Sequence, residues 1–156
     1  MRQGGLHVSE ILTQRIIGDA LAARLITDVR KSWPELTDDL GARGVAQLEG
    51  YLRASASSVE PLTPSLPVDL FWHALLLRTR DYADVCELVA GGPIHHVPDD
   101  AEGCDPRAGR EAIGRTKEAM RAVGVEPDAD LWPGEGSAEC SQCHAGCSDS
   151  PNGPKK

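Results

Sequence analysis

The sequence predicts an all-α fold, a compact array of about five helices with a Cys-containing C-terminal tail. The first observation is periodicity: the clear segments repeat their apolar residues at helical spacing, and none alternates convincingly with a period of two. The second is a set of helix start and stop signals at the ends of these segments. The third is size. A chain of 156 residues suffices for one domain with its own core, and the 4% content of aromatic residues leaves that core to Leu, Ile, Val and Ala.

Two helices are expected in the first third of the chain. Ser9 can cap a helix over residues 10–30, whose apolar stripe is wide enough for a central helix. Pro34 ends this segment, because the residue before a proline avoids the helical region. Thr37 starts the next helix. Three glycines lower the helix propensity of that second segment, by up to ~1 kcal/mol each relative to alanine: Gly41, Gly44 and Gly50.

A pair of helices is expected in the centre of the chain. Pro67 fits the first turn of a helix, where its missing N–H costs nothing, and either Ser65 or Leu66 would be the cap. The apolar stripe is interrupted at Thr79, which we interpret as the cap of a further helix. The Gly-Gly-Pro sequence at residues 91–93 ends that helix, since glycine favours the left-handed stop and proline forbids continuation.

The last expected helix starts at the Asp-Pro pair of residues 105–106 and stops at Gly124. The Leu-Trp pair at residues 131–132 should fold back to cover the core. After it, apolar periodicity is lost and nothing remains that could bury a core. We therefore expect a helical domain over residues 1–133 and a flexible tail containing Cys and His over residues 134–156.

The charge balance restricts the partners. The net charge is −8, from 24 acidic and 16 basic residues, whereas a nucleic-acid-binding surface is basic, so we expect no nucleic acid. No window approaches the ~18–20 apolar residues of a membrane span, and residues 1–10 lack a signal-peptide pattern, so we expect no membrane association and a cytoplasmic location. The abundance of Arg, Ala and Gly suggests a bacterial chain. The partner, a protein or a small molecule, stays open.

A cluster of histidines gives the main candidate site. Asp69 and His73 are four residues apart and share one helical face, and His95 and His96 lie in the loop after the next expected helix. Neutral imidazoles with an open position suit Zn, Cu or Fe. Because two adjacent histidines cannot both face one metal without an unusual backbone, one of them is expected to be structural. Asp69 would orient His73 from the second shell. Alternatively, Asp69 only favours the helix N-terminus and His73 is an ordinary packed or exposed residue.

Tyr82 and Cys86 lie on the buried stripe of the second central helix and are further second-shell candidates. Cys86 has two other interpretations. It can be a small buried hydrophobic residue, or the nucleophile of a pair with His73 or His96. No oxyanion motif supports the nucleophilic pair.

The tail carries a second candidate site, in which three cysteines and a histidine lie within eight positions: Cys140, Cys143, His144 and Cys147. These soft ligands could form a tetrahedral zinc or copper site. The first three also match the c-type haem attachment pattern. Haem attachment requires export and a distal ligand, and the sequence shows no export signal, so we do not expect haem. The third possibility is a reduced tail without a dedicated ligand.

The central residues also resemble a known family. The residue pattern is Asp69-x-x-Trp72-His73-x-x-x-Leu77-x-Thr79-x-x-Tyr82-x-x-x-Cys86, followed by His95-His96-x-Pro98. It is similar to the glycine-rich domain-containing protein-like family, whose members occur in plants, fungi and actinobacteria, and the resemblance covers roughly residues 8–132. The family brings no settled activity. Its plant members have been linked to RNA binding, stress and development, but they carry domains that this chain lacks, and the glycine-rich tail is missing here.

Two functional hypotheses follow. The first is a small metal-binding protein, with His73 and either His95 or His96 as ligands, which could serve as a metal-dependent enzyme of bacterial secondary or accessory metabolism. The second is a non-catalytic helical interaction or accessory module with no metal in its core, in which Trp72, His73 and Tyr82 only define the fold. The sequence names neither a catalytic residue nor a reaction.

Overall fold

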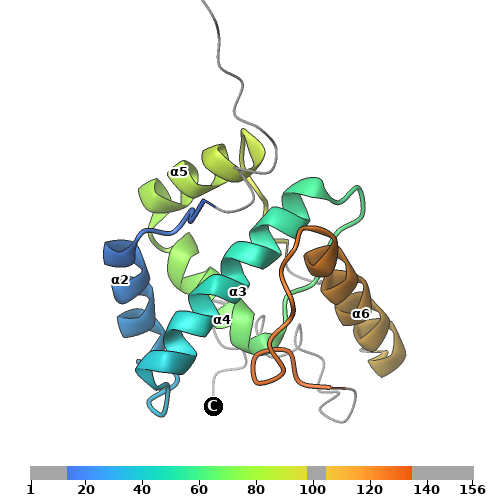
Figure 1. The fold of residues 1–156 in the computed structure, drawn as a ribbon, viewed down its shortest axis with the longest axis horizontal. Helices are drawn as coiled ribbons and strands as arrows, with labels where there is room; N and C mark the ends of the chain where they lie inside the picture. Colours follow the sequence, from blue (N-terminus) through green and yellow to red (C-terminus); the bar gives the residue numbers. More distant parts are fainter. Residues whose placement is uncertain (1–13, 98–104, 135–156) are drawn as a thin grey trace, which may run out of the picture.

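The computed structural model describes residues 14–97 and 105–134 of the chain, and these residues form five α-helices and no strand. The helices are α2 (Asp19–Val29), α3 (Asp38–Ser57), α4 (Leu66–Leu76), α5 (Thr79–Ala90) and α6 (Pro106–Ala122). Figure 1 shows α3 crossing the middle of the molecule with the other helices around it. The expected all-α array is therefore confirmed. None of the helices in the described ranges is long and apolar enough to cross a membrane.

The central element is α3, which contacts α2, α4, α5 and α6. Glycines allow two of its neighbours to come close. A Cβ atom on Gly44 would lie 2.3 Å from the ring of Phe71 on α4, and one on Gly50 would lie 2.6 Å from Cγ1 of Val125. Any larger residue would push these neighbours away, so the tight packing offsets the helix propensity that the glycines cost.

The first helix is shorter than predicted, and it is not the central one. It begins at Asp19, and its N-cap Gly18 has an extended backbone (φ −67°, ψ 162°). Residues 14–18 are not helical, and the N–H of Ile17 donates to Oε1 of Glu49 on α3 at 2.7 Å. The prediction of a helix through these positions was wrong because Gly18 disfavours helix and the long-range bond to Glu49 takes up a backbone donor. The remaining expected residues, 10–13, lie outside the described ranges.

Most of the predicted helix ends are confirmed. Three N-caps accept a hydrogen bond from the first turn of their helix, as expected: Thr37, Ser65 and Asp105. This settles the choice between Ser65 and Leu66. Thr79 is not a cap but the first residue of α5, and the cap position belongs to Arg78. The guanidinium of Arg78 donates instead to Oδ2 of Asp28, from Nε at 3.0 Å and from the terminal nitrogen at 2.7 Å, and so ties the α4–α5 junction to α2.

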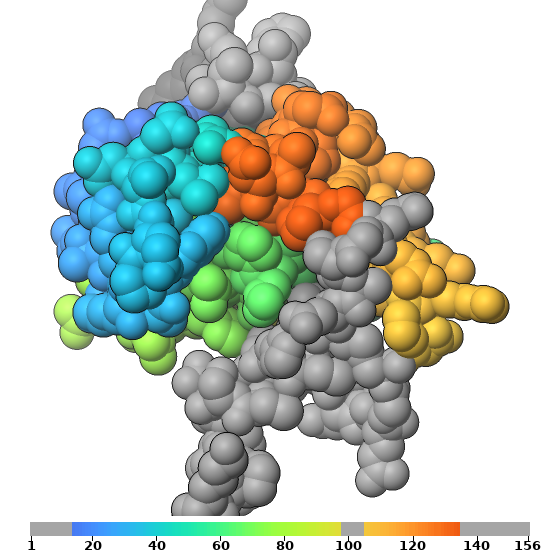
Figure 2. Space-filling view, turned by 90° about the horizontal axis from the view of Figure 1, so that it is seen from below, coloured from blue at the N-terminus to red at the C-terminus, as the bar shows by residue number. Residues whose placement is uncertain are grey.

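The segment 123–134 folds back on the helices, as the sequence predicted. Gly124 has a left-handed backbone (φ 81°) that turns the chain after α6. Leu131 and Trp132 are then buried, and Nε1 of Trp132 donates to Oε1 of Gln47 on α3 at 2.8 Å. Figure 2 shows this segment (orange) at the surface between α6 and the first half of the chain (blue to cyan), with α4 (green) beside it.

Candidate metal centre

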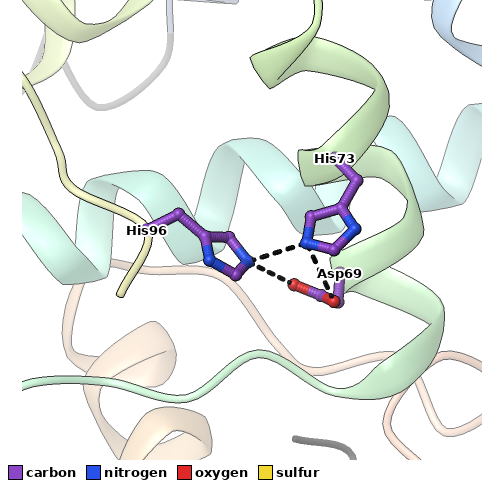
Figure 3. A group of neighbouring side chains, drawn as sticks. All are labelled: Asp69, His73 and His96. Atoms are coloured by element: carbon purple, nitrogen blue, oxygen red, sulfur yellow. Dashed lines mark hydrogen bonds and ion pairs between the residues drawn. The ribbon is translucent and has the colours of Figure 1, made fainter. Parts of the chain in front are cut away.

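Three polar side chains meet on one side of α4 (Figure 3). Asp69 and His73 come from α4, and His96 comes from the segment 91–97 that follows α5. Nε2 of His96 lies 3.0 Å from Oδ1 of Asp69 and 3.0 Å from Nε2 of His73. Nε2 of His73 lies 3.5 Å from Oδ2 of Asp69. In the part of the chain that the structure describes, this is the group of Asp, Glu, His and Cys side chains that could hold a metal ion.

The helical spacing of α4 explains two of the three positions. Asp69 and His73 are one turn apart and therefore share a face, while Phe71 and Trp72 on the same helix are buried in the core. The Asp69 side chain is only 6% exposed, whereas the imidazoles of His73 and His96 are 28% and 20% exposed. The carboxylate thus lies at the base of the group, and the two rings form its rim toward solvent.

The third position depends on how the chain leaves α5. Gly91 has a left-handed backbone (φ 65°), which ends the helix and turns the chain. The Tyr82 hydroxyl on α5 then donates to the carbonyl oxygen of Ile94. From there, burial alternates: Ile94 and His96 are partly buried, and His95 and Val97 are exposed. His96 is therefore the one of the two adjacent histidines that faces α4, and His95 faces solvent.

Aromatic rings support His96 from the core side. The indole of Trp72 lies 4.4 Å from the His96 ring, centroid to centroid, at an interplanar angle of 46°. The indole also packs against the Tyr51 ring, at 5.0 Å between ring centroids. Trp72 is 4% exposed and donates from Nε1 to the Tyr82 hydroxyl oxygen at 3.3 Å. The His96 ring therefore rests against a buried indole while part of its side chain stays exposed.

The geometry favours a shared cation. An imidazole nitrogen has a single in-plane direction in which it carries either a proton or a lone pair, yet Nε2 of His96 is within bonding distance of two partners. One hydrogen cannot serve both contacts well, whereas a metal ion between the three groups would satisfy all of them. Bonds of ~2.0–2.2 Å at the tetrahedral angle separate two zinc ligands by about 3.3–3.6 Å. The observed separation of 3.5 Å falls in this range, and the two of 3.0 Å are slightly shorter.

The structure adds a second possible role for Asp69. The sequence predicted that its carboxylate would orient His73 from the second shell, and this stays a prediction. The two carboxylate oxygens face the Nε2 atoms of His73 and His96, so Asp69 could also be a ligand itself. The signal that could have shown this was the position of Asp69 in an apolar helix between Val68 and Leu70, which favours a buried carboxylate that needs a cationic partner.

The other predicted residues lie around or away from this group. Tyr82 contacts the segment that carries His96 and not the three converging atoms. Cys86 is a buried free thiol and does not belong to the group, which favours its interpretation as a small core residue over that of a nucleophile. The candidate ligands of the tail lie outside the described residues: Cys140, Cys143, His144 and Cys147.

Fold and site together define an all-α protein with a candidate Asp–His–His metal centre. The chain belongs to the UCP032817-like family, whose model matches residues 13–119. The match extends from before α2 into α6 and includes Asp69, His73 and His96. No curated protein and no solved structure matches the chain.

Proposed function

We propose that the protein binds one transition-metal ion through Asp69, His73 and His96, with zinc or copper as the metal. The observation that carries the proposal is the convergence of Nε2 of His73, Nε2 of His96 and the Asp69 carboxylate, all within 3.0–3.5 Å of a neighbour in the group. Nitrogen and oxygen donors of this kind suit Zn²⁺, Cu²⁺ and Fe²⁺. The buried carboxylate supports the proposal because a metal ion would compensate its charge.

We further propose that the bound metal has open positions for water or a substrate. Three protein ligands are the number found in catalytic zinc sites, and two histidines with one carboxylate are the ligand set of non-haem iron oxygenases. The partial exposure of both imidazoles supports access from solvent. A metal-dependent enzyme is therefore the finer form of the proposal, in which the metal would activate a bound water or a substrate oxygen.

The test is metal content of the full-length chain, purified without an affinity tag, in a background in which Cys140, Cys143 and Cys147 are replaced by Ser. This background removes the thiols of the tail as competing ligands. We expect one metal per chain, and less than a tenth of that in His73→Ala and in His96→Ala. His95→Ala is the matched control, because His95 is the exposed neighbour of His96 and its loss should leave the metal content unchanged.

Two outcomes would contradict the proposal. In the first, the background protein binds zinc and copper with dissociation constants in the micromolar range or weaker. In the second, His95→Ala loses as much metal as His96→Ala. Circular dichroism of each variant must still show the helical spectrum, so that a loss of metal is not a loss of fold.

A non-catalytic accessory module is the second candidate, and one observation favours it. The indole of Trp72 packs between Tyr51 and His96 in a largely buried aromatic cluster, which would stabilise the fold with or without a metal. In that case His73 and His96 would share a proton rather than a metal ion. The resemblance to the glycine-rich domain-containing protein-like family and the cytoplasmic location stay predictions.

A further inference from the structure

We propose that Tyr82 is the positioning residue of the metal centre: it holds the segment 91–97 so that His96 reaches Asp69 and His73. This inference rests on the proposed metal site. Tyr82 would touch neither metal nor substrate and would act through the backbone of Ile94.

The first step is the unequal support of the three ligands. Asp69 and His73 are fixed by the same regular helix, α4. His96 comes from a segment without helix or strand, in which every second residue is exposed. Ordering such a segment costs backbone entropy, so the affinity for metal depends on whether the segment is already ordered before the metal binds.

The second step is the position of the Tyr82 hydroxyl. It accepts a hydrogen bond from Nε1 of Trp72 at 3.3 Å and donates to the carbonyl oxygen of Ile94, two residues before His96. Burial raises the pKa of Tyr82 to about 12, so the hydroxyl keeps its proton and remains a donor over the physiological range. Because Trp72 also packs on the His96 ring, the same indole fixes both the anchor and the ligand.

The third step is that the chain contains a matched counterpart. Tyr51 is the second of the two tyrosines, and its hydroxyl donates to the carbonyl oxygen of Leu62 at 3.0 Å. Its ring packs on Trp72, whereas Tyr82 contacts the same indole through a hydrogen bond. The two tyrosines therefore share their indole neighbour and their type of hydrogen bond. They differ in the segment they hold, since only the Tyr82 segment carries a metal ligand.

The experiment compares Tyr82→Phe with Tyr51→Phe in the full-length background without the tail thiols. Zinc affinity is measured by competition with a chromophoric chelator, and stability of the metal-free protein by urea unfolding. For Tyr82→Phe we expect zinc affinity to fall by about 10–100-fold, the usual effect of losing a residue that orients a ligand. For Tyr51→Phe we expect zinc affinity within about twofold of the parent. Its loss of stability in urea should be at least as large as that of Tyr82→Phe, because Tyr51 is the more deeply buried of the two.

A purely structural role of Tyr82 would give a different result, in which both variants lower stability and neither lowers affinity more than the other. That result would overturn the inference and leave the metal site itself intact. If instead the parent protein binds no zinc, the proposed function fails. The positioning role of Tyr82 is then tested by NMR of the metal-free protein. Nuclear Overhauser contacts between the Trp72 indole and the His96 ring should disappear in Tyr82→Phe and persist in Tyr51→Phe. Their persistence in both variants would overturn the positioning role as well.

Discussion

Two segments of this molecule leave a helix at a left-handed glycine and return to the domain, but different forces hold them. After Gly124 the chain returns through Leu131 and Trp132, whose side chains are 0% and 2% exposed. After Gly91 it returns with Ile94 only partly buried against the core and with two polar contacts, the Tyr82–Ile94 hydrogen bond and the His96–Asp69 pair. Every second residue stays exposed.

The comparison indicates that the segment 123–134 is structural, whereas the segment 91–97 can respond to metal binding. Burial of Leu131 and Trp132 does not depend on a proton or an ion, so this apolar contact should persist whenever the domain is folded. The ion pairs from Arg43 to Asp128 and Asp130 add to it. The segment 91–97 is attached largely through the Tyr82 hydrogen bond and through His96, a candidate metal ligand, so its attachment should change when a metal binds. The fold thus takes one of the three candidate ligands, His96, from the segment whose contacts can change when a metal binds.

The largest expected effect is on the apolar anchor. Trp132→Ala should lower the free energy of unfolding by about 3–5 kcal/mol, the usual cost of truncating a buried aromatic side chain. It also leaves the Oε1 of Gln47 without its indole donor. Val97→Ala, at a side chain 75% exposed in the other segment, should change stability by no more than ~0.5 kcal/mol. Urea unfolding measures both, and equal effects would contradict the contrast between the segments.

A smaller effect is expected where α3 contacts the C-terminal segment. In Gly50→Ala the new Cβ would lie 2.6 Å from Cγ1 of Val125, so something must shift, and overpacking of this kind costs about 1–3 kcal/mol. Gly114→Ala on α6 is the control, because no atom lies within 4 Å of the added Cβ, and it should stabilise the protein by about 0.4–1 kcal/mol. The melting temperatures of the two variants should shift in opposite directions, down for Gly50→Ala and up for Gly114→Ala. A stabilising Gly50→Ala would show that the close approach is not a packing constraint.

The smallest effect is expected at high pH and on the polar segment. Burial raises the pKa of Tyr82 from 10.0 to about 12, and that of Tyr51 is also raised. The stability linked to Tyr82 is therefore fully present below pH 10 and is lost as the pH rises from 10.0 through about 12. The Tyr82 hydroxyl donates to Ile94 and the Tyr51 hydroxyl to Leu62, so neither tyrosine bond holds residues 123–134, and the segment 91–97 should detach first.

Phenolate absorbance of Tyr51→Phe reports Tyr82 alone, since the chain has two tyrosines. A midpoint near the ordinary value of 10.0 in the folded protein would contradict the buried anchor.

The sequence could predict what local chemistry decides. The caps Thr37 and Asp105 and the stops Gly91 and Gly124 act on their own helix and were identified correctly. The shared face of Asp69 and His73 follows from helical spacing alone.

What the sequence could not predict depends on contacts between distant segments. The start of α2 after Gly18 depends on Glu49 of α3. The choice of His96 over His95 depends on which residues of an extended segment face inward, and the Tyr82–Ile94 bond fixes that alternation. Gly44 allows the close approach of Phe71, which lies 27 positions away in the sequence. Helix propensity alone shows only that Gly44 destabilises its helix.

The central claim is that Asp69, His73 and His96 hold one metal ion. Its most direct test is a crystal structure of the zinc-loaded protein with an anomalous difference map collected on both sides of the zinc edge. The account predicts one strong peak about 2.0–2.2 Å from Nε2 of His73, Nε2 of His96 and a carboxylate oxygen of Asp69. A map with no peak between these three side chains would contradict it, whether zinc is bound elsewhere on the chain or not at all.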